Sequence, residues 1–232
     1  MKVQGLILGI LLVCCSNIVA QNLQFGFQYG IGIYNMNSLK SVTEKTYDQL
    51  PFESKIISNY PVYFYYEPIL KLLYKDLNFG ILYTYQSTGS RISSKDYSGE
   101  YKFDSRIYSN SPGLYVSYNM NHDLKYRFAL FSEIGINITK LNMNESINVD
   151  TVINNNYKFF TNSYYFKPGI VFSYKLKKLC FDISVGYFKE FKRNNFNLKG
   201  DPEAELPVKT KFLDSDIWDG FRFGITVSYT IF

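Results

Sequence analysis

The last stretch of the chain decides its fold class: residues 221–231 read FRFGITVSYTI. Every second residue is large and apolar, whereas the residues between them are small or polar. A period of two is the period at which the side chains of a β-strand point to opposite faces. Residues 23–33, LQFGFQYGIGI, repeat the pattern near the start of the chain, with Gly26 and Gly30 on the less apolar face. Both ends therefore predict strands that have one strongly apolar face.

Six further segments alternate in the same way: Val62–Pro68, Leu77–Tyr85, Leu114–Tyr118, Leu124–Ile138, Tyr164–Tyr174 and Leu179–Tyr187. The connections alternate in length: short ones lie near residues 71–76, 119–123 and 175–178, and long ones, expected to be loops, span residues 34–59, 87–104, 140–157 and 192–220. Short turns at one end and long loops at the other are typical of bacterial outer-membrane barrels. The sequence therefore predicts an all-β fold, an eight-stranded antiparallel up-and-down transmembrane β-barrel.

A soluble barrel that keeps apolar side chains inside would show the same alternation, so the interior volume has to decide. An eight-stranded barrel is just wide enough inside for side chains to fill. The apolar face here is built mainly of Phe, Tyr, Ile and Leu, in a chain with 20 Phe and 22 Tyr, and these side chains would not all fit. Ten residues of tilted strand span roughly 25 Å, the height of the apolar band of membrane barrels. We therefore expect the bulky face to meet lipid and the glycine-rich face to line the interior.

Residues 1–20 have the pattern of a secretory signal peptide. Lys2 is followed by the apolar run Leu6–Val13 and then by small and polar residues that end at Ala20. A charged start, a short apolar core and a small residue before the cleavage site mark such a peptide. The run is much shorter than the roughly 20 residues that a membrane-spanning helix needs. We expect cleavage after Ala20.

The predicted mature chain retains a single cysteine, Cys180, because Cys14 and Cys15 lie in the signal segment, where lipidation of either stays open as an alternative. One cysteine cannot close an internal disulfide, and we expect Cys180 to fill space in the barrel interior. The net charge is +5 without a basic block, so no nucleic-acid partner is predicted. No linker divides residues 21–232, which we treat as one outer-membrane β-barrel domain.

The alternating strands and the ending GITVSYTIF, residues 224–232, resemble the small outer-membrane β-barrel family of Bacteroidetes-type bacteria. That family includes proteins akin to OmpX, the OmpA barrel and the secretion accessory PorT. The resemblance implies a signal in the last strand for the barrel-assembly machinery, here Tyr229 and Phe232, although Phe232 is one position out of step with the other apolar residues. We expect outer-membrane lipid and lipopolysaccharide as partners. An even strand count places both termini in the periplasm.

Eight charged residues fall on the predicted interior face: Glu67, Lys125, Arg127, Glu133, Lys167, Asp182, Glu190 and Arg222. Carboxylates in contrasting environments could serve acid–base catalysis. Four acids and four bases also match a neutralising network, since buried charges have to be paired. We predict the structural network, in a lumen plugged further by Tyr63, Tyr65, Tyr115 and Tyr165.

The sequence predicts no enzyme active site, no cofactor and no metal centre. Its one histidine, His122, falls in a predicted periplasmic turn, which is the wrong side of the membrane for a lipid-modifying outer-membrane enzyme. Asp214, Asp216 and Asp219 cluster in the last long loop and could bind a divalent cation such as Ca²⁺, with a simple solvated loop as the alternative. Pro168 falls near the middle of a strand, where a bulge would accommodate it.

Three functions of different classes follow from these observations. The leading hypothesis is a non-enzymatic outer-membrane barrel, an envelope scaffold or surface-contact protein with a plugged lumen and long extracellular loops. The second, suggested only by the PorT-like resemblance, is an accessory of protein secretion or uptake that has an envelope partner. The third, a lipid-modifying outer-membrane enzyme, is disfavoured by the position of the histidine.

Overall fold

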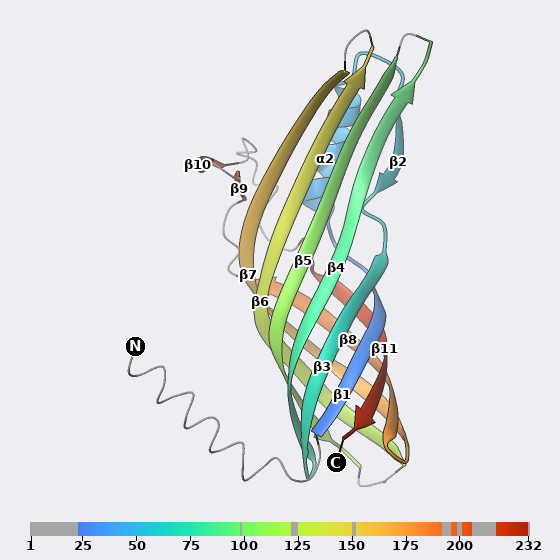
Figure 1. The fold of residues 1–232 in the computed structure, drawn as a ribbon, viewed down its shortest axis with the longest axis vertical. Helices are drawn as coiled ribbons and strands as arrows, with labels where there is room; N and C mark the ends of the chain where they lie inside the picture. The colour runs from blue at the N-terminus through green and yellow to red at the C-terminus, as the bar shows by residue number, and fades with distance from the viewer. Residues whose placement is uncertain are drawn as a thin grey trace.

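The structure, a computed structural model, describes residues 23–97, 99–121, 125–149, 152–191, 196–198, 201–205 and 217–231. Its ring contains eight strands (Figure 1): β1 (Leu23–Gly32), β3 (Tyr63–Tyr74), β4 (Leu77–Lys95), β5 (Glu100–Asn119), β6 (Tyr126–Asn148), β7 (Val152–Leu176), β8 (Leu179–Phe191) and β11 (Gly220–Thr230). Neighbours in this order pair antiparallel, and β1 pairs with β11 from Gln24 opposite Thr230 to Gly32 opposite Arg222. The prediction of an eight-stranded antiparallel up-and-down barrel is confirmed.

The apolar face of each barrel strand points outward. In β11, Ile225 is 59% exposed and its neighbour Thr226 only 3%. In β4, Ile81 is likewise 59% exposed and Leu82 6%. Glycines leave room in the interior for large side chains, since a Cβ at Gly30 would lie 2.4 Å from the ring of Tyr65. The alternation in the sequence therefore turns the barrel inside out relative to a soluble one.

Four strands are much longer than the sequence predicts. Strands β4, β5, β6 and β7 contain 19, 20, 23 and 25 residues, whereas β1, β3, β8 and β11 contain 10 to 13. Residues 87–104 and 140–157, expected to be loops, are mainly strand, and that expectation was wrong. We call residues 87–95, 100–108, 140–148 and 152–160 the wall, which rises beyond the other four strands (Figure 1). Nine residues of antiparallel strand rise roughly 30 Å.

The wall looked like loops because its outward residues are polar. Above Tyr85, the outward positions of β4 are Ser87, Gly89 and Arg91, so the large apolar face stops there. The inward positions, in contrast, stay apolar in several places, as at Ile107 and at Leu141 on the next strand. Where the outward side chains are no longer apolar, the side chains still alternate between the two faces, but the sequence loses the contrast that identifies a strand.

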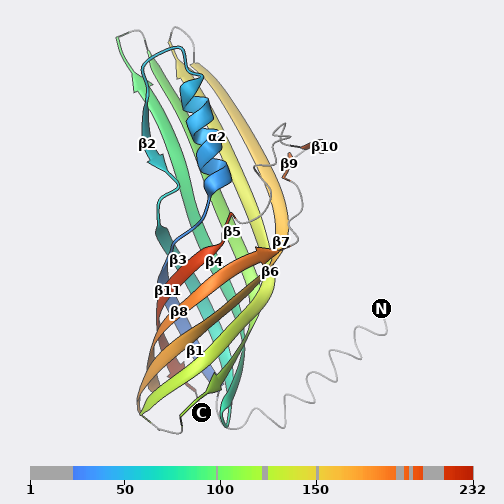
Figure 2. The same cartoon turned by 180° about the vertical axis from the view of Figure 1, so that it is seen from behind.

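The concave side of the wall carries a helix and a short strand. Helix α2 (Asn37–Asp48) lies along this side (Figure 2), and β2 (Lys55–Asn59) pairs with β4. Residues 34–59, expected to form a loop, therefore contain both elements. Leu39 and Thr43 are the buried residues of α2, and the Thr43 hydroxyl lies 2.9 Å from that of Ser90 on β4. Two short strands lie beside β7: β9 (Asn197–Leu198) pairs with β7, and β10 (Asp201–Glu205) pairs with β9.

Pro168 lies in β7 without a bulge. Phe166 faces Lys189 and Gly169 faces Gly186, which is the same register on both sides of the proline. The two positions between them lack pairing with β8, as expected where a proline has no N–H to donate. The ladder is interrupted but not shifted, so the predicted bulge was wrong.

Candidate functional site: a charged barrel interior beneath an apolar plug

The centre of the barrel holds an ion triad. Lys167 on β7 places its Nζ 2.7 Å from Oε1 of Glu133 on β6 and 3.2 Å from Oε2 of Glu67 on β3. All three residues are at most 3% exposed. The Thr84 hydroxyl donates a 2.6 Å hydrogen bond to Glu67. Alternation along three different strands turns these side chains to the same point in the interior.

A second ion pair lies nearer the end with the short turns. Lys71 Nζ is 3.0 Å from Oδ2 of Asp182, and the Cys180 thiol lies 3.2 Å from Oδ1 of the same carboxylate. The sequence analysis missed Lys71, because β3 was expected to end at Pro68. Lys71 shares the inward parity of Glu67, and this parity was the signal that could have identified it. A cavity of about 30 Å³ beside this pair has room for about one or two waters.

Two further carboxylates hold the segment ahead of β11 against the barrel. Glu190 accepts hydrogen bonds from Asn137 Nδ2 at 2.5 Å, from Ser163 Oγ at 2.6 Å and from the Trp218 N–H at 3.0 Å. Asp219 accepts from the Glu190 N–H at 2.7 Å and lies 2.5 Å from Lys189 Nζ. These contacts fix residues 217–219 at the mouth of the barrel.

Arg222 holds the same segment by other means. Its Nη2 donates to the Trp218 carbonyl at 2.6 Å, and its Nη1 to the carbonyl of Phe221 at 3.2 Å. The guanidinium lies between the rings of Tyr34 and Phe188, 4.5 and 4.9 Å from their centroids. The expectation that Arg222 pairs with a carboxylate does not describe these contacts, because carbonyls and ring faces take its charge instead.

An apolar cluster closes the barrel above the charged layer. We call Tyr34, Met36, Leu39, Ile217 and Trp218 the apolar plug; each is at most 5% exposed. The plug packs on inward side chains of the wall and the barrel, which include Ile107, Leu141, Phe159 and Phe188. Trp218 meets the Tyr34 ring edge-on at 5.0 Å and donates from Nε1 to the Thr139 hydroxyl at 3.0 Å.

Tyr60, just ahead of β3, is buried in the same apolar cluster as Leu39 of α2. Its hydroxyl lies 2.6 Å from the Ser105 hydroxyl on β5. Burial raises the pKa of Tyr60 above its ordinary value, so the hydroxyl keeps its proton at neutral pH. The position is structural, since it ties the chain ahead of β3 to the inner face of the wall.

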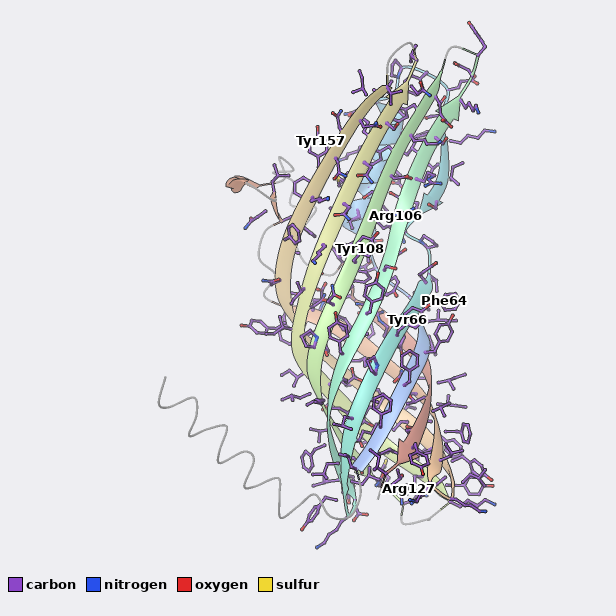
Figure 3. The ribbon with its side chains drawn as sticks, viewed as in Figure 1. Phe64, Tyr66, Arg106, Tyr108, Arg127 and Tyr157 are labelled. Atoms are coloured by element: carbon purple, nitrogen blue, oxygen red, sulfur yellow. The ribbon has the colours of Figure 1, made fainter. Side chains whose placement is uncertain are left out.

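The predicted site residues divide into three groups. Glu67, Glu133, Lys167, Asp182, Glu190 and Arg222 are buried in the interior. Arg127 lines the small cavity at the lower mouth (Figure 3), whereas Lys125 is exposed, with its ammonium 5.7 and 5.6 Å from the rings of Tyr126 and Tyr174. His122, Asp214, Asp216, Phe232 and residues 1–20 lie outside the described residues. Lys125 precedes β6, which begins at Tyr126, and is exposed rather than enclosed by the barrel.

Other predicted residues also have a place. Tyr63, expected to fill the lumen, is 49% exposed, whereas Tyr65, Tyr115 and Tyr165 are buried. Tyr63 lies above the last residue that pairs β3 with β4, so it no longer faces an enclosed interior. Asp219 is buried against Lys189 and the backbone of Glu190. Tyr229 points outward on β11 and is 48% exposed.

The chemistry of this interior is that of a packed, charged core. Among the described residues, no three His, Cys, Asp or Glu side chains are placed to hold a metal ion together. The described helix is too short and too polar to cross a membrane. Each buried carboxylate of the interior contacts a cation, a hydroxyl, an amide or a backbone N–H. The arrangement supplies cohesion between strands that are distant in sequence.

No protein-family model and no curated protein sequence matches this chain. Solved structures that are similar include a major outer membrane protein from Thermus thermophilus, with 12% identity and a TM-score of 0.49, covering 91% of this chain and 100% of that one. The outer membrane protein OprG from Pseudomonas aeruginosa has 13% identity and a TM-score of 0.43, covering 90% and 94%. Neisserial surface protein A has 11% identity and a TM-score of 0.40, covering 90% and 97%. The strand pairing of this chain, rather than these likenesses, defines its fold.

Proposed function

We propose that this protein spans the outer membrane of a Gram-negative cell as a plugged, non-enzymatic barrel and presents its wall to the exterior. The observation that carries the proposal is the belt of exposed apolar side chains around the barrel. Near the middle of four different strands, Ile81, Ile134, Ile183 and Ile225 are 54–59% exposed. Soluble monomers rarely expose continuous apolar patches above a few hundred Å². Such a belt is suited to contact with the hydrocarbon core of a membrane.

Aromatic residues border the belt at both ends. Near the short turns, Tyr74, Tyr118, Tyr126 and Tyr229 are exposed. At the other end, Phe64 and Tyr66 of β3 point outward, just below Tyr108 of β5 (Figure 3). Aromatic girdles at the two membrane interfaces accompany the apolar band of transmembrane barrels. The closed ring also satisfies the backbone hydrogen bonds that lipid leaves without partners.

The turns suggest the orientation. Short turns join β3 to β4 and β7 to β8 at the end where β1 begins and β11 finishes (Figure 1). Such turns face the periplasm in bacterial barrels, and the larger structures face outward. We therefore place both ends of the barrel domain in the periplasm and the wall, with α2 on its concave side, outside the cell.

The plugged interior favours a scaffold or surface-contact role over a channel. The triad of Lys167, the pair of Lys71 and Asp182, and the apolar plug occupy successive layers of the lumen. The wall is then the part that can contact the surroundings. A role as an accessory of secretion or uptake is the alternative, and co-purification of a stoichiometric envelope partner would favour it.

Fractionation tests the location, and conductance tests the plug. The protein should appear with the outer membrane, resist carbonate extraction and migrate differently in detergent gels before and after boiling. A soluble periplasmic monomer would rule out the proposed location. In planar bilayers the purified protein should give no large, stable currents; such currents would rule out the plugged interior.

A further inference from the structure

A groove opens on the outer surface where β3 separates from β4. The two strands pair up to Tyr65 opposite Gln86. The chain next meets β4 at Pro61, whose carbonyl accepts a 3.0 Å hydrogen bond from the Thr88 hydroxyl, and at Tyr60, whose N–H donates to the Gly89 carbonyl at 2.9 Å. Pro61 has no N–H to donate to β4, and Tyr60 has a left-handed φ of 47°. The chain therefore bows away from β4 and leaves a cavity of about 470 Å³.

The lining of this groove combines small polar residues and two tyrosines with the charged residues Arg91, Asp104 and Arg106. Ser87 and Gly89 of β4 form part of it, and Tyr63 and Tyr108 contribute rings. The side chain of Arg106 lies across Gly89, since a Cβ at Gly89 would come within 3.4 Å of Arg106 Cγ. Any larger residue at position 89 would compete with Arg106 for this space.

The charge around the groove is positive. Arg91 and Asp104 neutralise each other through hydrogen bonds of 2.5 and 2.9 Å. In the part of the chain that the structure describes, no carboxylate lies within ion-pair distance of Arg106 or of Lys140. Lys140 lies directly opposite Tyr108 on β6 and is exposed. Two cations therefore lie beside Tyr108: Arg106, two residues earlier on β5, and Lys140, whose ammonium also lies 5.7 Å from the centroid of the Phe160 ring.

The height of the groove is that of the membrane surface. Tyr108 pairs with Ser87 on one side and Lys140 on the other, and this row is the first above the apolar belt. Below it, Tyr83 and Ile136 belong to the exposed apolar belt. In Figure 3, Arg106 and Tyr108 lie above Phe64 and Tyr66. A lipid whose chains lie on the belt would place its headgroup here.

We propose that the groove, together with Lys140, binds the phosphorylated sugar headgroup of an outer-leaflet glycolipid whose acyl chains lie along the apolar belt. The inference rests on the proposed outer-membrane location. Arginine suits a phosphate because its planar fork can donate two parallel hydrogen bonds. The rings of Tyr63 and Tyr108 offer flat surfaces for a sugar, and Ser87 offers a hydroxyl. The acyl chains would supply the apolar area that a free phosphate lacks.

Native mass spectrometry of the delipidated full-length protein in detergent tests this site. The probes are bis-phosphorylated lipid A, the same lipid after removal of its phosphates, and inorganic phosphate. Wild-type protein should retain lipid A, and Arg106→Gln or Lys140→Gln should weaken retention about tenfold, the effect of losing one good charge-assisted contact. Lys95→Gln, which removes a cation at the upper end of β4 outside the groove, is the matched control and should behave as wild type.

The outcomes separate the possible sources of the phosphate and the two proposals. Retention of lipid A by Arg106→Gln at the wild-type level would overturn the site, provided that the variant still shows the mobility of a folded barrel. Equal binding of the dephosphorylated lipid would overturn phosphate recognition. Equal competition by inorganic phosphate would overturn the lipid as the occupant. If the protein fractionates with the outer membrane in any of these cases, the proposed function stands and only the groove assignment fails.

Discussion

Removal of the central cation is the sharpest perturbation of the barrel interior. Lys167→Met takes away the ammonium between Glu67 and Glu133, which are 0% and 2% exposed. Among the described residues, Lys167 is the only cation within ion-pair distance of either carboxylate. Glu67 keeps its hydrogen bond from Thr84, whereas Glu133 loses its ion pair. Breaking a buried ion pair from one side costs about 3–5 kcal/mol, so we expect a loss of that size in the free energy of unfolding.

A compensating variant separates this cost from a general packing defect. Glu67→Gln, Glu133→Gln and Lys167→Met together remove all three charges, and replacement of a whole buried charge group is often neutral or stabilising by about 1–4 kcal/mol. Lys158→Met, on the exposed outer side of the same strand, is the matched control and should change stability by less than about 0.5 kcal/mol. The assay is urea unfolding in detergent, followed by the fluorescence of Trp218, the chain's one tryptophan, and by gel mobility. Wild-type stability of Lys167→Met alone would refute a dry, paired interior.

Three further changes test other layers. Ile225→Arg, near the proposed membrane midplane, should lower the free energy of unfolding by about 2–4 kcal/mol, while Asn144→Arg on the wall should lower it little. Equal losses for the two variants in urea titrations would count against a lipid-facing belt. Trp218→Ala should lower stability by about 3–5 kcal/mol because the residue is fully buried in the apolar plug; a gel-mobility midpoint in urea equal to wild type would show that the plug does not hold the barrel. Reducing agent should leave the gel-mobility midpoint unchanged, because Cys180 is the one cysteine outside the predicted signal segment and one thiol cannot close a loop; a shift would reveal an intermolecular disulfide.

The barrel could be predicted from the sequence because the two faces of each barrel strand differ strongly in the size and polarity of their side chains. Outward Ile225 and inward Thr226 differ in both size and polarity, and the contrast repeats along each barrel strand. Above the belt, the outward side chains are small or polar and the contrast disappears. Ser87, Gly89 and Arg91 have the composition of a loop, and only the pairing with β5 shows that they continue a strand. The wall was therefore missed for a physical reason. Its strands are held by backbone hydrogen bonds to their neighbours, and these bonds leave no pattern in the sequence of one strand.

The interior site could be predicted in part. Parity alone placed Glu67, Glu133 and Lys167 on one face, and the structure brings them together. Parity could not identify partners, which depend on the register between strands that are distant in sequence. Arg222 was therefore expected to pair with a carboxylate, where the structure supplies carbonyls and rings. Lys71 was missed as the partner of Asp182 because β3 was expected to end at Pro68.

The measurement that tests the account most directly is the environment of outward residues in a reconstituted membrane. Nitroxide labels placed by cysteine substitution at Ile134 and Ile225, in a Cys180→Ser background, should be accessible to oxygen but shielded from a water-soluble nickel reagent. Labels at Asn144 and Lys158 on the wall should show the reverse. Nickel accessibility at Ile225 equal to that at Asn144 would contradict a barrel whose apolar belt faces lipid.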